Sequence, residues 1–304
     1  MEDRAAVADR STASEADLLR LTTARRGLNQ RLISRFLHNR IALVGLFIVT
    51  IMVALAAFGP VLAPHPPDQQ FGEHRLESPS KDFLLGTDNL GRDMLSRLLH
   101  AARLSIGMAA LATVVIVAIA ISVGSLAGYV GGLVDDLAMR IVDVLLAFPG
   151  LILALAIIGI LGPSMLNVII SLAISTWASC ARLVRGLVLE VRERPFVEAA
   201  LAIGASGPRI VIRHILPNVI SPVIVLVSLE MGTLILAIAG LNFLGLGVQP
   251  PTAEWGAMLN QGRPFFQSEP QLMIYPGIMI SVTVLGFNLL GDGLRDVFDP
   301  RFTT

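Results

Sequence analysis

Residues 104–129 read LSIGMAALATVVIVAIAISVGSLAGY, and no side chain in this stretch is charged. A transmembrane α-helix needs about 20 predominantly apolar residues, because the hydrocarbon core of a bilayer is about 30 Å thick. The stretch is long enough and apolar enough to cross a membrane as a helix. It therefore decides the class of fold, and the rest of the chain can be compared with it.

The composition of the whole chain agrees with a membrane location. Hydrophobic residues make up 54% of the 304 residues and charged residues 15%, and the mean hydropathy is +0.72. Soluble domains carry about 25% charged residues, so this composition excludes the soluble enzyme classes. The net charge is zero, which argues against nucleic acid as a partner. The single cysteine, Cys180, excludes an internal disulfide bond.

Five further segments have the character of membrane-spanning helices, namely 41–59, 141–161, 165–182, 219–241 and 272–290. The stretch Leu161-Gly162-Pro163-Ser164 separates two of them, since glycine and proline interrupt helices. The predicted fold class is therefore an all-α integral membrane protein with six transmembrane helices. Arginines concentrate near both termini and in the connection 183–218, so the positive-inside rule places both termini in the cytoplasm.

This topology divides the chain into successive parts. Residues 1–30 are polar and charged, and we expect them to form a disordered cytoplasmic tail. The remaining parts are an N-terminal segment with the first transmembrane helix (31–67), a periplasmic or extracellular segment (68–103), a core of five transmembrane helices (104–291) and a cytoplasmic C-terminal tail (292–304).

The longest cytoplasmic connection, 183–218, contains the sequence RPFVEAALAIGASGPRIVIRHILPN. Proline is tolerated in a first helical turn and glycine commonly ends a helix, so one short helix is expected from Pro195 to Gly204. Ser206 can cap a second short helix, and Pro217 is expected to stop it. The connection is thus predicted to be a helix-turn-helix.

One face of the first short helix is small and apolar. Val197, Ala200, Leu201 and Gly204 share this face at helical spacing. We expect it to be buried against something. From physical chemistry alone two interpretations stay open, since the face can pack against the chain's own helices or dock on another protein.

The order of residues in this connection also resembles a known motif, the EAA loop of binding-protein-dependent ABC importers. The resemblance implies the type I ABC importer permease fold, in which a cytoplasmic coupling helix inserts into a cleft of an ATPase. The residues that it assigns to ATPase coupling are Glu198, Ala199, Ala200, Gly204, His214, Leu216 and Pro217.

Other stretches resemble the "C" permease of the dipeptide, oligopeptide and nickel branch, namely Leu85 to Asp93 (LGTDNLGRD), His214 to Asn218 (HILPN), Phe243 to Gly247 (FLGLG) and the run from Asn288 to Arg301. This resemblance implies import of di- or oligopeptides by alternating access, with the chain forming half of the translocation pathway. Nickel, haem-like compounds or glutathione are alternative substrates. An ion-driven secondary transporter is a remoter alternative, which would not explain the helix-turn-helix.

The resemblance further implies a set of partners in a bacterial cytoplasmic membrane. They are a homologous second permease, two cytoplasmic ABC ATPase subunits or domains, and an extracytoplasmic substrate-binding protein. ATP and Mg would be bound by the ATPases, because the chain lacks the Gly-x-x-x-x-Gly-Lys-Ser/Thr phosphate loop. We expect no enzymatic activity, cofactor or metal in the chain itself.

A charged residue interrupts the apolar character of the fifth span. Glu230 lies near its middle, where an ionised side chain costs about 2.5–3.5 kcal/mol. Such a residue is expected to face a cavity or to hydrogen-bond a neighbouring helix. The candidates for the translocation pathway are Glu230, Asn242 and Asn288.

Four charged residues gather in the periplasmic segment, namely Asp88, Arg92, Asp93 and Arg97. They either contact a substrate-binding protein or tie this segment to the outer mouth of the pathway. Trp255 is expected at the outer membrane interface, where tryptophan is enriched. On the cytoplasmic side, Arg140 and Asp143 are three residues apart and are expected to pair on one helical face.

Overall fold

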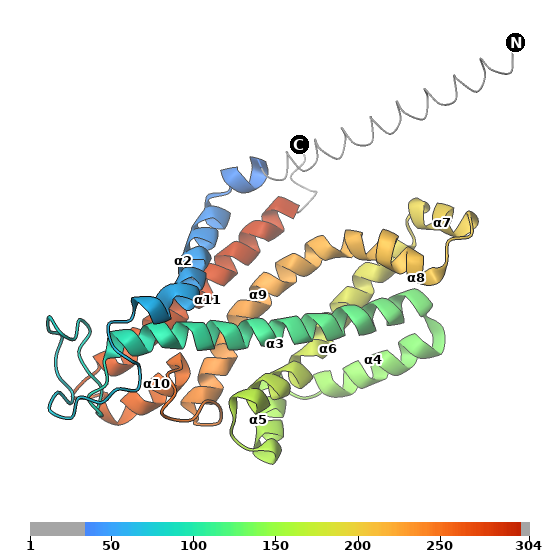
Figure 1. The fold of residues 1–304 in the computed structure, drawn as a ribbon. Coiled ribbons are helices and arrows are strands. Elements are labelled where there is room, and N and C mark those ends of the chain that lie inside the picture. The colour runs from blue at the N-terminus through green and yellow to red at the C-terminus, as the bar shows by residue number, and fades with distance from the viewer. Residues whose placement is uncertain (1–33, 299–304) are drawn as a thin grey trace, which may run out of the picture.

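The computed structural model describes residues 34–298, so the expected tail 1–30 and residues 299–304 lie outside the described part. Within that part the chain is helical, with one isolated β-bridge between Thr87 and Asp93. Figure 1 shows the arrangement of the helices. They are α2 (Arg40–Leu62), α3 (Met94–Val130), α4 (Gly132–Leu146), α5 (Gly150–Leu161), α6 (Met165–Arg192), α7 (Pro195–Ala202), α8 (Gly207–Ile210), η1 (Val211–Ile215), α9 (Leu216–Phe243), α10 (Trp255–Gly262), η2 (Arg263–Phe265) and α11 (Gln271–Phe298).

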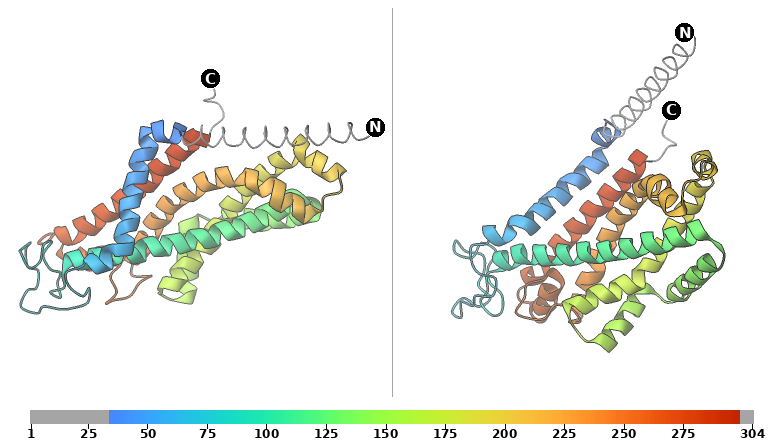
Figure 2. Two further views of the ribbon diagram at one scale, coloured as in Figure 1. Left: turned by 45° about the horizontal axis from the view of Figure 1, so that its top comes forward. Right: turned by 45° about the vertical axis from the view of Figure 1, so that its right-hand side comes forward.

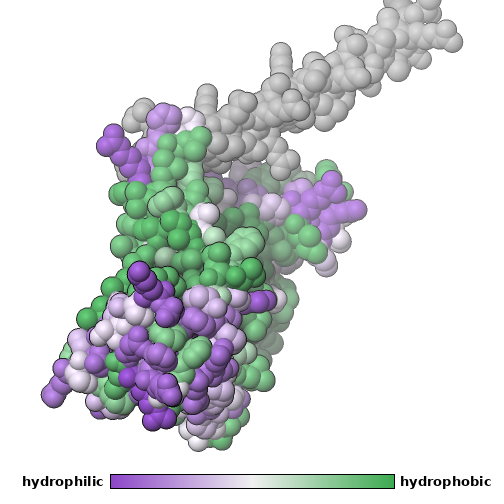
Figure 3. Space-filling view, turned by 60° about the vertical axis from the view of Figure 1, so that its left-hand side comes forward, coloured by the Kyte–Doolittle hydropathy of each residue, from purple (hydrophilic) through white to green (hydrophobic). Residues whose placement is uncertain are grey.

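The membrane-spanning elements agree with the predicted fold class. Five helical segments are long and apolar enough to cross a membrane, and the bent pair of α4 and α5 gives a sixth when it is counted as one span. Figure 3 shows the hydrophobic surface of the helices beside a hydrophilic cap at one end of the molecule. The prediction of an all-α membrane protein with six spans is therefore confirmed, with α4 and α5 counted as one span.

The third span differs from the straight helix expected over 141–161. It begins earlier, at Gly132, and α5 leaves α4 at an angle of 87°. The break falls at Pro149, which lacks an amide hydrogen and restricts the residue before it. The break after α5 is as expected, and there Ser164 caps α6 by accepting a hydrogen bond from the Asn167 amide at 3.1 Å.

The second span is longer than expected. Because α3 begins at Met94, its first turns belong to the segment 68–103 that was expected to be periplasmic. Asp93 sets this early start, since its carboxylate accepts the Ser96 amide hydrogen at 2.9 Å and so satisfies one of the free donors of the first turn. At the other end, Gly131 (φ +71°) turns the chain from α3 into α4.

Two helix pairs approach each other through small residues, as is common between membrane helices. A Cβ atom at Gly45 of α2 would lie 2.3 Å from the backbone nitrogen of Leu290 in α11. One at Gly124 of α3 would lie 2.6 Å from the carbonyl oxygen of Ala181 in α6. Figure 2 shows the consequence: α2 runs beside α11, and α3 packs along α6.

Candidate functional site

The expected helix-turn-helix is present as α7 and α8, at one end of the helical bundle (Figures 1 and 2). Pro195 occupies the first turn of α7. Gly204 ends the helix with φ +81°, a conformation that residues with a Cβ atom rarely adopt. Its amide donates to Leu201 O at 2.9 Å, and the Ala205 amide donates to Ala200 O at 3.0 Å, which is the Schellman pattern. We call α7 and α8 with their connection the coupling hairpin.

The apolar face of α7 is divided between two environments. Val197 and Ala200 are buried within the chain, so this half follows the first interpretation given above. Leu201 is exposed, and Ile203 at the end of the helix has 85% of its surface exposed. Glu198 also lies on the exposed side. The hairpin thus has an anchored face and an open face, and the open face combines a carboxylate with large apolar side chains.

Residues at the ends of α3 and α6 contact the coupling hairpin. The Arg192 guanidinium of α6 lies 5.9 Å from the centre of the Tyr129 ring and donates to the Gly128 carbonyl oxygen of α3 at 3.3 Å. The Tyr129 ring in turn lies against Gly207 of α8, where a Cβ atom would meet the ring at 3.1 Å. These contacts connect α3, α6 and α8, so the position of the hairpin is linked to two membrane-spanning helices.

Pro217 does not stop the second helix, contrary to the sequence-based expectation. The Leu216 amide donates to Val211 O, five residues earlier, so residues 211–215 form a π-helical turn that leads directly into α9. Such a turn changes the hydrogen-bond pattern where proline has no amide hydrogen to donate. The Asn218 side-chain nitrogen then donates to His214 O at 2.6 Å. We call residues 211–218 the joint, because this irregular segment connects the coupling hairpin to α9.

The joint contains some of the residues that were predicted to couple to the ATPase. His214 and Leu216 are half-buried and Pro217 is exposed, and all three belong to the joint rather than to the open face of α7. Asn218 was not among the predicted site residues. Its position directly after a proline was the available signal, since asparagine can hydrogen-bond a carbonyl that the irregular backbone leaves free.

The expected pair of Arg140 and Asp143 is not formed in the described residues. Asp143 instead contacts Arg182, and Asp135 forms an ion pair with Arg185 at 2.5 Å. Both acidic residues thus pair with α6 rather than within α4. Helical spacing identifies only partners on the same helix, whereas the turn after α3 brings α4 against α6.

Glu230 lies on α9 and is half-buried near Cys180 of α6. Within residues 34–298 its carboxylate has no hydrogen bond or ion pair. Two cavities of about 340 and 410 Å³ follow one another between α6 and α9, and both are lined by Leu187 and Pro222. The second cavity reaches Leu229, next to Glu230. A furrow therefore follows α6 and α9 from the hairpin end of the bundle as far as Leu229 and Arg295.

The two asparagines of the predicted pathway lie in different places. Asn288 is on α11 and its side-chain oxygen lies against Gly232 of α9, one half-turn from Glu230. Asn242 is buried at the end of α9, where it donates to Ile238 O at 2.9 Å and accepts the Val248 amide hydrogen at 2.6 Å. Asn288 therefore faces Gly232, on the side of α9 away from Glu230, while Asn242 holds the turn that follows α9.

The charged residues of segment 68–103 form a buried network at the opposite end of the bundle from the hairpin. Asp88 lies 2.6 Å from Arg92 and 3.5 Å from Arg97, measured between side-chain nitrogen and oxygen atoms. Gln261 of α10 accepts hydrogen bonds from both arginines, at 2.9 and 3.1 Å. Asp93 caps α3 and is fully buried. This burial favours the interpretation that the network ties the segment to the helices.

Two further residues strengthen this end of the molecule. Glu254 is buried in the loop before α10, where it accepts hydrogen bonds from Ser105 Oγ at 2.8 Å and from the Ala257 amide at 2.9 Å. Burial raises the pKa of the Glu254 carboxyl, and these hydrogen bonds oppose the shift. Trp255 is fully buried and donates to Leu98 O at 3.2 Å. Trp255 therefore packs inside the chain, where α10 holds it against α3.

The geometry defines a multi-pass membrane component that carries the short helix α7 outside its candidate spans. Residues 120–304 match the family described as "Binding-protein-dependent transport system inner membrane component". Residues 27–79 match the "N-terminal TM domain of oligopeptide transport permease C". The chain belongs to this family of inner membrane components and is a permease subunit of an ABC importer, not an ion-driven secondary transporter.

Relatives of known function cover most of the chain. The dipeptide transport system permease protein DppC of Alkalihalophilus pseudofirmus is 44% identical over 263 residues, which are 86% of this chain and 86% of that protein. The glutathione transport system permease protein GsiD of Pectobacterium atrosepticum is 43% identical over 268 residues, which are 88% and 89% of the two chains.

A solved structure shows the same fold. A chain of the MetNI methionine ABC transporter, in an inward-facing conformation, aligns with a TM-score of 0.54 at 20% identity and covers 68% of this chain and 98% of that one. The likeness confirms the type I permease fold that the sequence motifs implied.

Proposed function

We propose that this permease subunit imports di- or oligopeptides across the bacterial inner membrane by alternating access. The chain would provide half of the pathway, and a homologous second permease the other half. A substrate-binding protein would deliver the peptide outside, and two ABC ATPases would bind ATP and Mg inside. Both termini and the coupling hairpin are then cytoplasmic. Peptide is favoured because a dipeptide permease and a glutathione permease are similarly close relatives.

The observation that carries this proposal is the connection between the coupling hairpin and α9. The open face of α7, with Glu198, Leu201 and Ile203, would dock on the ATPase. The joint follows the hairpin and continues into α9, the helix of Glu230, with no intervening loop. A displacement of the hairpin can therefore move α9. This transmits energy only if the ATPase binds the hairpin differently in its two states.

The test is ATP hydrolysis and peptide uptake measured together in vesicles that contain the whole transporter. Glu198→Lys reverses a charge on the open face, and we expect uptake to fall at least ten-fold while the chain remains folded. Asp82→Lys is the matched control, because Asp82 is exposed in the segment at the opposite end of the molecule. Normal coupled uptake by Glu198→Lys would contradict the docking role.

Glutathione is the second candidate substrate, supported by the GsiD relative. Both a free peptide and glutathione carry an ammonium group, which the unpaired carboxylate of Glu230 can attract. Glu230→Gln should therefore reduce uptake of a free dipeptide roughly ten-fold, the worth of a charge-assisted hydrogen bond. Uptake of the N-acetylated dipeptide should be unchanged by the substitution. Competition between labelled dipeptide and glutathione in the wild type then identifies the preferred substrate.

A further inference from the structure

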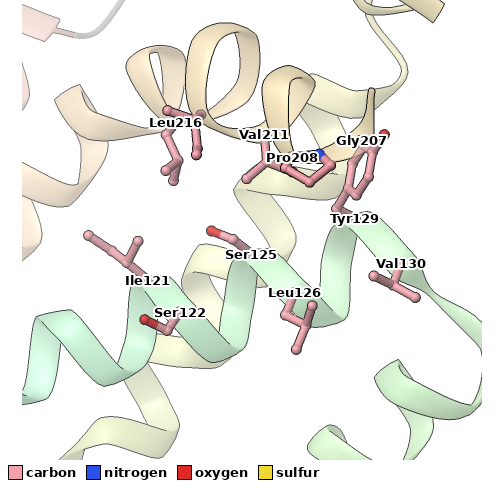
Figure 4. Close-up of a pocket in the computed structure, with 11 residues that line it drawn as sticks. Ile121, Ser122, Ser125, Leu126, Tyr129, Val130, Gly207, Pro208, Val211 and Leu216 are labelled. Carbon is pink, nitrogen blue, oxygen red and sulfur yellow. The ribbon is translucent and has the colours of Figure 1, made fainter. Parts of the chain in front are cut away.

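A cavity of about 420 Å³ lies between the end of α3 and the segment that runs from α8 through the joint. Figure 4 shows its walls, with side chains of α3 on one side and those of α8 and the joint on the other. Its lining residues are Ile121, Ser122, Ser125, Leu126, Tyr129, Val130, Gly207, Pro208, Val211, Ile212 and Leu216. The lining is almost entirely apolar, and it is distinct from the furrow between α6 and α9.

One polar group in this cavity lacks a partner. Ser125 is 6% exposed, and its hydroxyl has no hydrogen bond to any described residue. In Figure 4 this hydroxyl points toward Val211 and Leu216 across the cavity. The neighbouring Ser122 differs, because its hydroxyl donates to Ala118 O within α3 at 2.8 Å. A buried hydroxyl without a partner is costly, so Ser125 indicates a ligand that offers an acceptor.

The exposed side chains of the segments that line the cavity are apolar and positive. Leu126, Val130 and Ile212 are exposed, and the exposed fraction of Ile212 is 67%. Arg209 and Arg213 are exposed, and each follows a lining residue of α8 or the joint in the sequence. Neither arginine has an ion pair among the residues that the structure describes. The site therefore offers an apolar interior with the Ser125 hydroxyl as a free donor, and two exposed arginines lie on the segments that line it.

We propose that this cavity binds an anionic phospholipid of the cytoplasmic leaflet. One acyl chain fills the cavity, and an ester carbonyl oxygen accepts a hydrogen bond from the Ser125 hydroxyl. The phosphate lies near Arg209 and Arg213. A peptide fits poorly, because its charged ends and amides find few polar partners in these apolar walls. A bilayer supplies the acyl chain at the depth where α3 leaves the membrane.

The site has a consequence for the joint, because Val211, Ile212 and Leu216 belong to both. An acyl chain held between α3 and these residues restrains the joint. The joint is the segment through which a displacement of the hairpin would reach α9. This inference rests on the proposed cytoplasmic position of the hairpin, and its test is independent of transport.

The test uses phosphatidylglycerol with a photoreactive diazirine on one acyl chain. The full chain, with the subunits that co-purify with it, is reconstituted in phosphatidylcholine vesicles containing this probe, and labelled peptides are identified by mass spectrometry. We expect saturable labelling within 121–130 and 207–216, displaced by unlabelled phosphatidylglycerol and not by added phosphatidylcholine. Labelling that is unsaturable and equally strong on the exposed face of α5 would overturn the proposal, and so would equal displacement by both lipids.

Matched variants locate the contact. Ser125→Leu should abolish labelling by filling the cavity, and Ser125→Ala should weaken it about two- to ten-fold through loss of one hydrogen bond. Ser122→Ala should leave it unchanged, because that hydroxyl is already bonded within its helix. Unchanged labelling of folded Ser125→Leu would overturn the site. If Ser125→Leu does not fold, displacement in the wild type decides. Peptide uptake is measured in separate vesicles, so a failure of the proposed transport function can be told apart from a failure of lipid binding.

Discussion

The outer network and the coupling hairpin lie at opposite ends of the bundle and differ in which side chains they bury. By the outer network we mean the buried charges Asp88, Arg92 and Arg97 with Gln261, named after the side on which the proposed topology places them. Asp88, Arg92 and Arg97 are charged, yet they are buried and paired with one another and with Gln261. The hairpin instead leaves Ile203 exposed, although its side chain is apolar. The outer network pairs its charged side chains within the chain, whereas the hairpin leaves a surface that a partner can cover.

This difference bears on how a transporter subunit can move. A buried network of ion pairs holds the outer segment to α3 and α10, so that end has few alternative arrangements. The hairpin is held on one face only and continues through a π-helical turn, an irregular geometry often found at functional hinges. We therefore expect substitutions at the outer end to affect stability and those at the hairpin end to affect coupling.

The largest effect is expected from Arg97→Met. The side chain is buried, and its loss leaves Asp88 with one partner fewer and removes bonds to Gln261 and two backbone carbonyls. Removing one member of a buried ion pair costs about 3–5 kcal/mol. The yield of folded protein and its thermal midpoint in detergent should fall sharply. Arg103→Met on the same helix is the control, since Arg103 is exposed, and equal stability of the two variants would contradict the structural role.

A second prediction separates the two faces of α7. Val197→Ala removes two buried methyl groups and should lower the free energy of unfolding by about 1–2 kcal/mol. Ile203→Ser, at an exposed position, should leave the thermal midpoint within about 1 °C of the wild type but reduce the ATPase that co-purifies. If Ile203→Ser were the less stable variant, the assignment of the two faces would be wrong.

A third prediction concerns the joint. Asn218→Ala removes the hydrogen bond to His214 O, worth about 0.5–1.5 kcal/mol, and should lower the number of peptides imported per ATP several-fold. Ser179→Ala is a suitable control, because Ser179 makes a similar side-chain bond to the backbone of α6, away from the joint. Equal coupling ratios in the two variants would show that the Asn218 contact has no part in transmission.

The smallest effect is a pH dependence at the outer end. Because burial raises the pKa of Glu254, the folded chain holds a proton there that the unfolded chain releases above its usual pKa of 4.5. This stabilisation is complete below pH 4.5 and is lost as pH rises through the raised pKa. Glu254→Gln should remove this part of the pH dependence of the thermal midpoint, a change of a few degrees. A Glu254→Gln curve parallel to that of the wild type would exclude the effect.

Much of the fold could be predicted because hydropathy depends on local composition. The six spans, the break after Leu161 and the two short helices each follow from apolar runs and from proline or glycine positions. The bend at Pro149 was not predicted, because the proline lies in a long uncharged segment that was interpreted as a single helix over 141–161. The continuation through Pro217 was missed because a π-helical turn depends on backbone bonds that have no simple sequence signal.

The candidate site was predictable in part for the same reason. Glu198 and Gly204 occupy a local motif, and the structure gives that motif its expected helix and turn. The partners of Asp135 and Asp143 come from α6, and Gln261 reaches Arg92 and Arg97 from α10, so no local spacing reveals these contacts. Ser125 was missed because a serine in an apolar helix is unremarkable until its surroundings are known.

The most direct test of the coupling hairpin is photo-crosslinking in native membranes. A benzophenone amino acid replaces Ile203 on the open face, and in a parallel sample it replaces the exposed Asp82 at the outer end. We predict that the Ile203 sample yields a covalent product with a cytoplasmic ATPase and that the Asp82 sample yields none. Absence of an ATPase product from position 203, with the transporter assembled and active, would contradict the docking of the hairpin.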